Sequence, residues 1–299
     1  MNREKVMEIR GLTKYYGNVV GIEDLDLDLY KREILGYLGP NGAGKTTTIR
    51  TCLGLLSKTE GEVKIFELDS HKDSVEIRKK TGYLPWDFGL FPDMKVKTVL
   101  KYFLSLSNIK NQEKMLELSD RLELDLDRKV KELSKGNRQK VGLVQAFMAD
   151  QDLIILDEPT SGLDPLMQQE VYDILREERE DGKTIFMSSH ILAEVEEVCD
   201  RIAIIRNGKL QVVEDIESIQ SKMGKKLVVE FRDDIDPELF RIPGVNQIEV
   251  EDSKISMIVT ENLDRLIKEI SNYKIINMSL ETFSLEQLFL RYYSEEGGK

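Results

Sequence analysis

The feature that most constrains this chain of 299 residues is a glycine-rich segment placed directly after the short apolar run 34–38. The segment reads Gly39-Pro40-Asn41-Gly42-Ala43-Gly44-Lys45-Thr46-Thr47, and residues 48–56 behind it have a helical pattern. The spacing Gly-x4-Gly-Lys-Thr between a strand and a helix is typical of a phosphate-binding loop. Its glycines let backbone N–H groups curve around an anion at the helix N-terminus. We therefore expect Lys45 to reach the β- and γ-phosphates of a nucleotide and Thr46 to hold Mg²⁺.

Carboxylates follow the next strongly apolar run. Residues 153–156 read as a strand buried on both faces, and Asp157-Glu158 comes directly after them. Because neighbouring strand residues face opposite ways, the two can have different tasks. We expect Asp157 to hold Mg²⁺ and Glu158 to polarise the attacking water. The alternative is a solvated acidic pair that begins a turn.

A histidine ends the buried run after that one. His190 follows Met187-Ser188-Ser189, and its imidazole is positioned to donate a hydrogen bond to a γ-phosphate and so detect that group. The alternative for a lone histidine at a strand end is a structural role. Its place on the same expected sheet edge as Asp157 favours the functional interpretation.

The order of elements predicts an α/β fold with a parallel sheet and a smaller domain behind it. Strand-like runs fill the first 65 residues, and residues 95–150 are mostly helical. We expect a first domain at residues 1–217 and a small α+β domain at residues 225–299, after a change in composition. The expected elements of the second domain are strands near 227–231, 248–250 and 275–278 and helices at 262–270 and 284–293.

Charge and composition exclude several classes of function. The formal net charge is −12, which disfavours a nucleic-acid partner. No apolar run is long enough to span a membrane, and no signal peptide is visible, so we expect a cytosolic protein. Cys52 and Cys199 lie far apart, and with only two histidines neither a disulfide framework nor a zinc site is expected.

One further motif changes the interpretation of the whole set. Leu133-Ser134-Lys135-Gly136-Asn137-Arg138-Gln139 opens a helix with a serine cap, which alone is unremarkable. In order with Tyr16, the glycine-rich segment, residues 156–164 and His190, it makes residues 2–213 resemble the ATP-binding subunit of an ABC transporter. The form Ser-Lys-Gly-Asn-Arg-Gln and the tail 285–290 resemble the ABC-2-type exporter branch most closely.

The resemblance implies an Mg²⁺-dependent ATPase with a mixed sheet core, an antiparallel β subdomain and a helical subdomain at about residues 95–150. It implies that a second ATP-binding subunit pairs head to tail, with Ser134 and Gly136 of one subunit on the γ-phosphate held by the other. Lys135 and Asn137 belong to the same segment. The partner would be a separate transmembrane permease that keeps the subunit at the inner face of the membrane. The exported compound would be selected by that permease.

Two further residues receive roles from the resemblance, each with a plainer alternative. Tyr16 would stack on adenine, or is an ordinary half-buried strand aromatic. Asp164 would signal between the two nucleotide sites, although capping of the next helix is a sufficient role. The apolar stretch 88–94 would receive the permease, or covers the core as a loop.

The chain departs from the family pattern at two positions. Trp86 stands where a Gln or Glu often contacts Mg²⁺, so either Asp87 substitutes or the site lacks that ligand. Lys135 replaces a more usual glycine, and it either helps to neutralise the γ-phosphate bound to the other subunit or extends into solvent.

Three other classes of function are alternatives to a transporter subunit. They are a soluble ABC ATPase of repair or translation, a kinase or GTPase, and a module that binds ATP without hydrolysing it. The chain has a single cassette, no heptad insertion and no guanine-reading Asn-Lys-x-Asp element.

Overall fold

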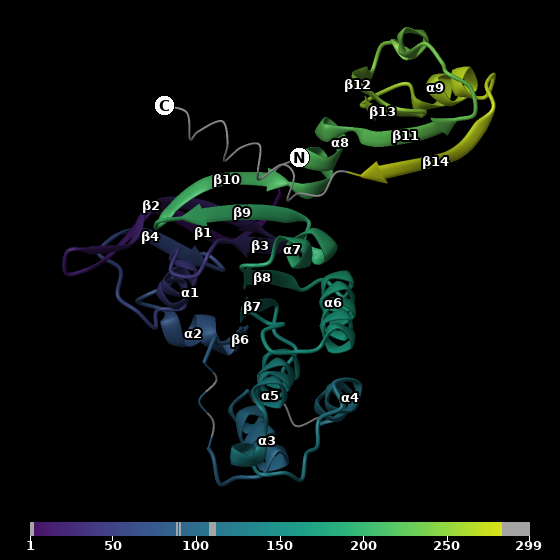
Figure 1. Ribbon diagram of the computed structural model, residues 1–299. Coiled ribbons are helices and arrows are strands. Elements are labelled where there is room, and N and C mark those ends of the chain that lie inside the picture. Colours follow the sequence, from purple (N-terminus) through teal and green to yellow (C-terminus); the bar gives the residue numbers. More distant parts are fainter. Residues whose placement is uncertain (1–2, 88, 90, 108–111, 283–299) are drawn as a thin grey trace. The chain divides into compact units, whose positions relative to one another are not determined.

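The computed structural model describes residues 3–87, 89, 91–107 and 112–282 (Figure 1). The chain forms two compact units, Met1–Glu214 and Asp215–Lys299. We expected the first domain to extend to residue 217 and the second to begin at 225, but the segment between them forms helix α8 (Ile216–Met223) of the second unit. Asp215 caps this helix by accepting a hydrogen bond from the Ser218 N–H. The helix expected at 284–293 lies outside the described residues.

A six-stranded sheet forms the centre of the first unit, in the order β10-β9-β3-β8-β7-β6. The pairs β3–β8, β3–β9, β7–β8 and β6–β7 are all parallel, so their carboxyl ends meet along one edge. The strands are β3 (Ile34–Leu38), β6 (Thr81–Leu84), β7 (Leu153–Asp157), β8 (Thr184–Ser189), β9 (Arg201–Arg206) and β10 (Lys209–Asp215). Strands β3, β7 and β8 are buried along their whole length, which explains their continuous apolar sequence.

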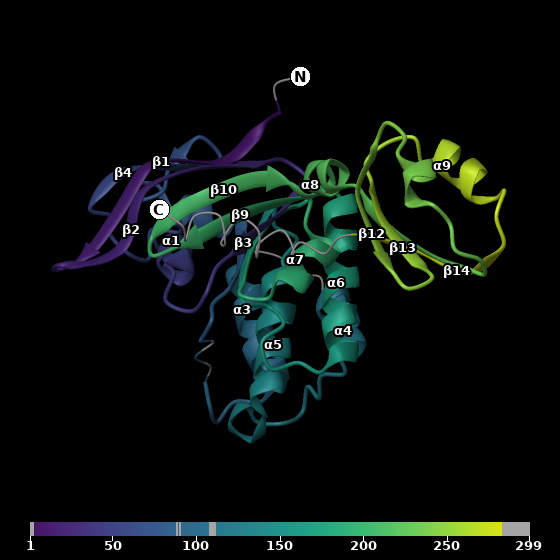
Figure 2. The same ribbon diagram turned by 45° about the horizontal axis from the view of Figure 1, so that its top comes forward.

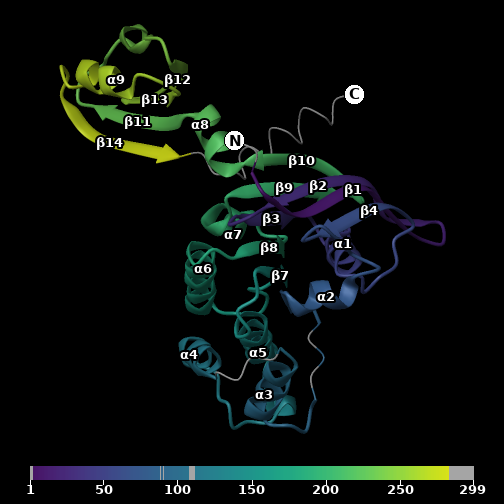
Figure 3. The same cartoon turned by 180° about the vertical axis from the view of Figure 1, so that it is seen from behind.

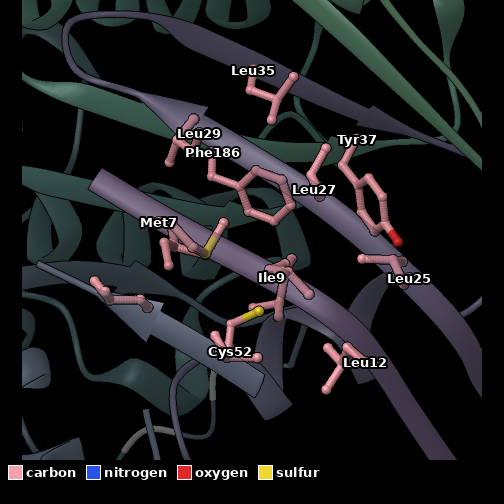
Figure 4. Packing of buried hydrophobic residues seen from close by; sticks show 14 of the residues in the cluster. Met7, Ile9, Leu12, Leu25, Leu27, Leu29, Leu35, Tyr37, Cys52 and Phe186 are labelled. Atoms are coloured by element: carbon pink, nitrogen blue, oxygen red, sulfur yellow. The ribbon is translucent and has the colours of Figure 1, made fainter. Parts of the chain in front are cut away.

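An antiparallel sheet of order β2-β1-β4-β5 packs against this centre. Its strands are β1 (Lys5–Tyr16), β2 (Val19–Tyr30), β4 (Glu60–Ile65) and β5 (Leu68–Asp69). Figure 4 shows apolar side chains of β1 and β2 gathered with Tyr37 and Phe186 of the central sheet. The rings of Tyr37 and Phe186 have centroids 5.3 Å apart. This shared core fixes the strand that precedes the glycine-rich segment.

Helices complete the first unit, as Figures 2 and 3 show from two further sides. The region expected to be helical contains α3, α4, the 3₁₀ turn η1 and α5, of which α3 and α4 both pack on α5. The helices are α1 (Lys45–Cys52), α2 (Ser74–Lys79), α3 (Val96–Leu106), α4 (Glu113–Arg121), η1 (Val130–Glu132), α5 (Lys135–Phe147), α6 (Pro165–Glu180) and α7 (Leu192–Val198). Within the described part of the chain, no helix combines the length and the apolar character that crossing a membrane requires.

The second unit is a small α+β fold with its own core. After α8, its antiparallel sheet has the strand order β12-β13-β11-β14. This is the order of two interleaved β-α-β segments. In the first segment the 3₁₀ turn η2 stands in place of the helix. Strand β13 was not expected from the sequence. The elements are β11 (Lys225–Phe231), η2 (Pro237–Phe240), β12 (Val245–Glu251), β13 (Lys254–Val259), α9 (Leu263–Ile270) and β14 (Ile275–Thr282). Phe231 and Phe240 stack in the core with ring centroids 5.6 Å apart.

Candidate active site

The glycine-rich segment runs from the end of β3 into α1. The helix begins at Lys45 rather than at Thr48 as expected, because Gly44 caps it in the left-handed conformation with φ of 113°. Among the described residues no side chain caps this helix end, and its first turn holds no acidic residue. A Cβ on Gly44 would lie 2.6 Å from the Gly21 carbonyl oxygen, whereas a Cβ on Gly42 would have no atom of the described residues within 4 Å. The loop therefore packs tightly on its protein side and is open on the other, which suits a phosphate group.

Lys45 has its ammonium group over this loop. The side chain is only 6% exposed, and Nζ donates hydrogen bonds to the carbonyl oxygens of Gly39 at 2.6 Å and Pro40 at 3.3 Å. It also lies 3.2 Å from Glu158 Oε1. The lysine charge is thus held within the site by acceptors that a phosphate group can replace.

Thr46 and Asp157, the two residues that we expect to hold Mg²⁺, contact each other. Thr46 Oγ1 donates to Asp157 Oδ2 at 2.7 Å, and Ser188 Oγ donates to Asp157 Oδ1 at 2.6 Å. Burial raises the pKa of Asp157, and the two hydroxyl hydrogen bonds oppose that rise. A hydroxyl beside a carboxylate is the oxygen donor set that Mg²⁺ uses next to a bound phosphate. Among the described residues no group of three or more His, Cys, Asp or Glu side chains forms a metal cluster.

Glu158 lies just beyond the end of β7, not on the strand. Its φ of 56° is in the left-handed region, so its direction does not follow from the alternation of side chains along a strand, contrary to expectation. The peptide N–H of Glu158 donates to both the carbonyl oxygen and Oγ of Ser188, which holds this conformation. Such backbone strain often accompanies functional sites.

The Glu158 carboxylate is buried between the side chains of Lys45 and His190. Oε2 lies 2.7 Å from His190 Nδ1, while Oε1 lies near Lys45 but has no hydrogen-bond donor among the described residues. A buried acceptor without a donor is a place where a water molecule fits. Because Nδ1 must donate to the carboxylate, Nε2 of His190 can donate to a phosphate only when the imidazole is doubly protonated.

Two buried side chains to which the sequence analysis gave no role hold this arrangement. Gln139 of α5 donates through Nε2 to the carbonyl oxygens of Glu158 at 2.9 Å and Pro159 at 3.0 Å. Glu194 of α7 accepts hydrogen bonds from Thr160 at 2.5 Å and from Ser189 at 2.6 Å. In the sequence, Gln139 closes the segment 133–139, whereas Glu194 is marked only as a polar residue in a helical pattern.

Tyr16 lies at the edge of the same site. Its hydroxyl is 3.4 Å from Thr47 Oγ1, and Lys14 Nζ lies 5.2 Å from the ring centroid. The side chain is 48% exposed, so the ring presents an open face beside the start of α1. A half-exposed ring at the end of β1 is compatible with both alternatives, a stacking surface and a half-buried strand aromatic.

The segment 133–137 lies against the turn that follows Glu158. Ser134 caps α5 by accepting a hydrogen bond from the Asn137 N–H at 3.2 Å. A Cβ on Gly136 would lie 2.5 Å from the Gly162 carbonyl oxygen, so only glycine fits there. Asp164 caps α6, accepting from the N–H groups of the second and third residues after it at 3.1 Å each.

Trp86 and Lys135, the two residues that depart from the family pattern, contact each other. Lys135 Nζ lies 5.1 Å from the centroid of the Trp86 ring and 3.3 Å from Ser161 Oγ. Lys135 is exposed, but its ammonium group contacts both of these side chains. The apolar stretch 88–94 is only partly described. Within it Phe91 packs edge to face on Tyr102, and both rings are about half exposed.

Comparison with known proteins gives a consistent result. Residues 22–161 match the ABC transporter family. The chain is 39% identical to the uncharacterized ABC transporter ATP-binding protein YhaQ of Bacillus subtilis, over 77% of this chain and 78% of that one. It is 33% identical to the Nod factor export ATP-binding protein I of Cupriavidus metallidurans, over 78% of each. A solved structure of an ATP-binding subunit of an ABC transporter aligns with a TM-score of 0.66 and 28% identity, over 73% of this chain and 92% of that one.

Proposed function

This chain belongs to the ATP-binding subunits of ABC transporters and is an ATPase, and we propose that it drives export through a separate transmembrane permease. The observation that carries the proposal is the meeting of Lys45, Glu158 and His190 at the carboxyl edge of the central sheet, beside the phosphate loop. In such a site the backbone N–H groups and Lys45 hold the phosphates, Glu158 orients the attacking water, and His190 contacts the γ-phosphate.

Mg²⁺ fits beside this phosphate site. Thr46 and Asp157 would hold it, since their oxygens are already in contact. When bound, the ion neutralises charge on the phosphate oxygens. Trp86 contributes no ligand, because an indole has no lone pair to offer a metal ion. The remaining coordination positions would be filled by phosphate and water, which is the usual habit of this ion.

Pairing of two subunits follows from the open side of the phosphate loop. One loop surrounds one side of a triphosphate and leaves charged oxygens facing water. The helix start at Ser134 and Gly136 is a second N-terminus that would satisfy those oxygens from another chain. ATP that is bound only by the paired subunits favours the paired form by mass action. Hydrolysis of the ATP removes this bridge and lets the two subunits separate. Opening and closing of the pair would move the permease.

Export is supported by the relative from Cupriavidus metallidurans, whose name assigns it to Nod factor export. The compound carried by this system would be a drug, antibiotic, ion, lipid or polysaccharide. The test is to purify the tagged chain from detergent-solubilised membranes and from the soluble fraction of the source cells. We expect a polytopic membrane protein to co-purify with the tagged chain in stoichiometric amount from the membrane fraction, with the tagged chain at the inner face of the membrane. Recovery with ribosomes or DNA instead would favour a soluble ATPase of translation or repair.

Removal of the second unit is expected to leave nucleotide binding intact. The second unit has a separate hydrophobic core, and all residues of the candidate site lie in the first. A chain ending at Glu214 should therefore bind ATP within about twofold of the full chain, as expected for a domain that folds alone. Calorimetric titration with ATP, with circular dichroism as the control for folding, measures this. Loss of binding by a folded truncated chain would contradict the division. If the truncated chain binds ATP normally, the second unit is free to serve regulation or subunit pairing.

A further inference from the structure

Lys135 is the residue through which three loops of the first unit meet. Trp86 follows β6, Lys135 opens α5, and Ser161 lies in the turn after β7. The lysine ammonium group lies over the indole ring and donates a hydrogen bond to the serine hydroxyl. The methylene chain of Lys135 runs along Gly162, where a Cβ would lie 3.5 Å from Cδ. One side chain therefore fixes the start of α5 from two directions.

The turn held by Lys135 is the one that carries the Glu158 carboxylate. The Ser161 N–H donates to the Glu158 carbonyl oxygen at 3.2 Å, and Gln139, one turn further along α5, donates to the same oxygen. The start of α5 thus has a buried attachment through Gln139 and an exposed one through Lys135. An exposed cation–π contact is weak enough to break and re-form as the loops move.

We propose that Lys135 is a positioning residue, anchored by Trp86 and Ser161, that orients the Ser134–Gly136 segment for the second subunit. The proposal rests on the proposed function, because it needs two subunits that pair on ATP. Trp86 provides the aromatic face in place of a metal ligand. Loss of the lysine charge should weaken ATP-driven pairing and leave each subunit's own nucleotide affinity unchanged.

Tryptophan fluorescence tests whether the contact exists in solution, because Trp86 is the only tryptophan of the chain. Lys135→Met removes the charge above the indole and keeps the methylene chain. We expect the emission maximum of the nucleotide-free protein to shift in this variant. The matched control is Lys101→Met, which removes a charge from an exposed lysine of α3 and should leave the spectrum unchanged. Identical spectra for Lys135→Met and the parent would overturn the proposal.

Pairing is measured by light scattering during ATP titration, in a Glu158→Gln background that consumes little ATP. Lys135→Met should raise the ATP concentration at half-maximal pairing about fivefold, the factor that corresponds to one exposed cation–π contact. Lys135→Arg should restore pairing, because arginine also stacks on an aromatic face. Affinity for ADP, titrated where the chain is monomeric, should stay within about twofold, because the phosphate loop is untouched.

Variants of Trp86 separate this role from direct contact with a phosphate of the other subunit. Trp86→Ala should weaken pairing as Lys135→Met does, the double variant should show no further loss, and Trp86→Phe should retain most of the effect of the ring. Should Lys135→Met weaken pairing while Trp86→Ala leaves it unchanged, the lysine acts on the phosphate and the positioning role is rejected. A Glu158→Gln parent that never pairs on ATP contradicts the proposed function itself. A parent that pairs, with Lys135→Met pairing equally well, contradicts only this inference.

Discussion

Glu158→Gln is expected to lower the ATP turnover number by about 10²–10⁴-fold, the contribution of a positioned general base. The amide keeps the size of the side chain but cannot accept a proton from the attacking water. Folding should be preserved, because Lys45 keeps the carbonyl oxygens of Gly39 and Pro40 as acceptors when the carboxylate is lost. ATP should then persist in the site, and the paired form should last longer. Steady-state phosphate release and size-exclusion chromatography with ATP measure the two effects.

A matched control separates this role from a general effect of charge. Glu62→Gln removes the same charge from an exposed position of β4 and should leave turnover unchanged. A Glu158→Gln enzyme whose turnover stays within about tenfold of the parent would reject Glu158 as the base. Equal loss in both variants would point to the overall charge of the protein instead.

The glycine-rich segment and the buried strands could be predicted because their sequence patterns are local. Residues 153–156 and 184–187 are continuous apolar runs, and β7 and β8 form there. The hairpin at Asn207-Gly208 has positive φ at both residues, as that dipeptide predicts. Strand β13 also carried a signal that we did not use, since Ile255, Met257 and Val259 alternate inward. Local sequence patterns of this kind, apolar runs, a turn dipeptide and alternation, are sufficient to predict such elements.

The direction of Glu158 could not be predicted in this way. Its left-handed φ depends on Ser188, thirty residues along the chain, which accepts its peptide N–H twice. Gln139 and Glu194 likewise act through partners distant in sequence. Pairing patterns of this kind come from the assembled sheet, and no local pattern of apolar residues encodes them.

The contact between Trp86 and Lys135 also could not be predicted from local sequence patterns. The sequence marks each residue only by its own departure from the family pattern. Their distance in sequence gave no indication that they meet. The structure brings them together because β6 and α5 pack on each other. Helix α8 of the second unit shows a related limit, since its cap, Asp215, lies at the end of the preceding strand.

Lys45→Met is expected to abolish measurable nucleotide binding and, separately, to destabilise the nucleotide-free protein. Binding falls because the charge that faces the β- and γ-phosphates is gone. Stability falls because the variant leaves the buried Glu158 carboxylate without its lysine partner, and breaking a buried ion pair costs about 3 kcal/mol or more. Chemical unfolding and titration with ATP measure the two losses independently.

The double variant Lys45→Met/Glu158→Gln separates the two consequences. A neutral amide does not need the lysine cation, so most of the lost free energy of unfolding should return. Nucleotide binding should not return, because no charge has been restored to the phosphate loop. A double variant as unstable as Lys45→Met would mean that the lysine stabilises the loop chiefly through the carbonyl oxygens of Gly39 and Pro40. One that binds ATP normally would remove Lys45 from the site altogether, and with it the assignment of the loop to the triphosphate.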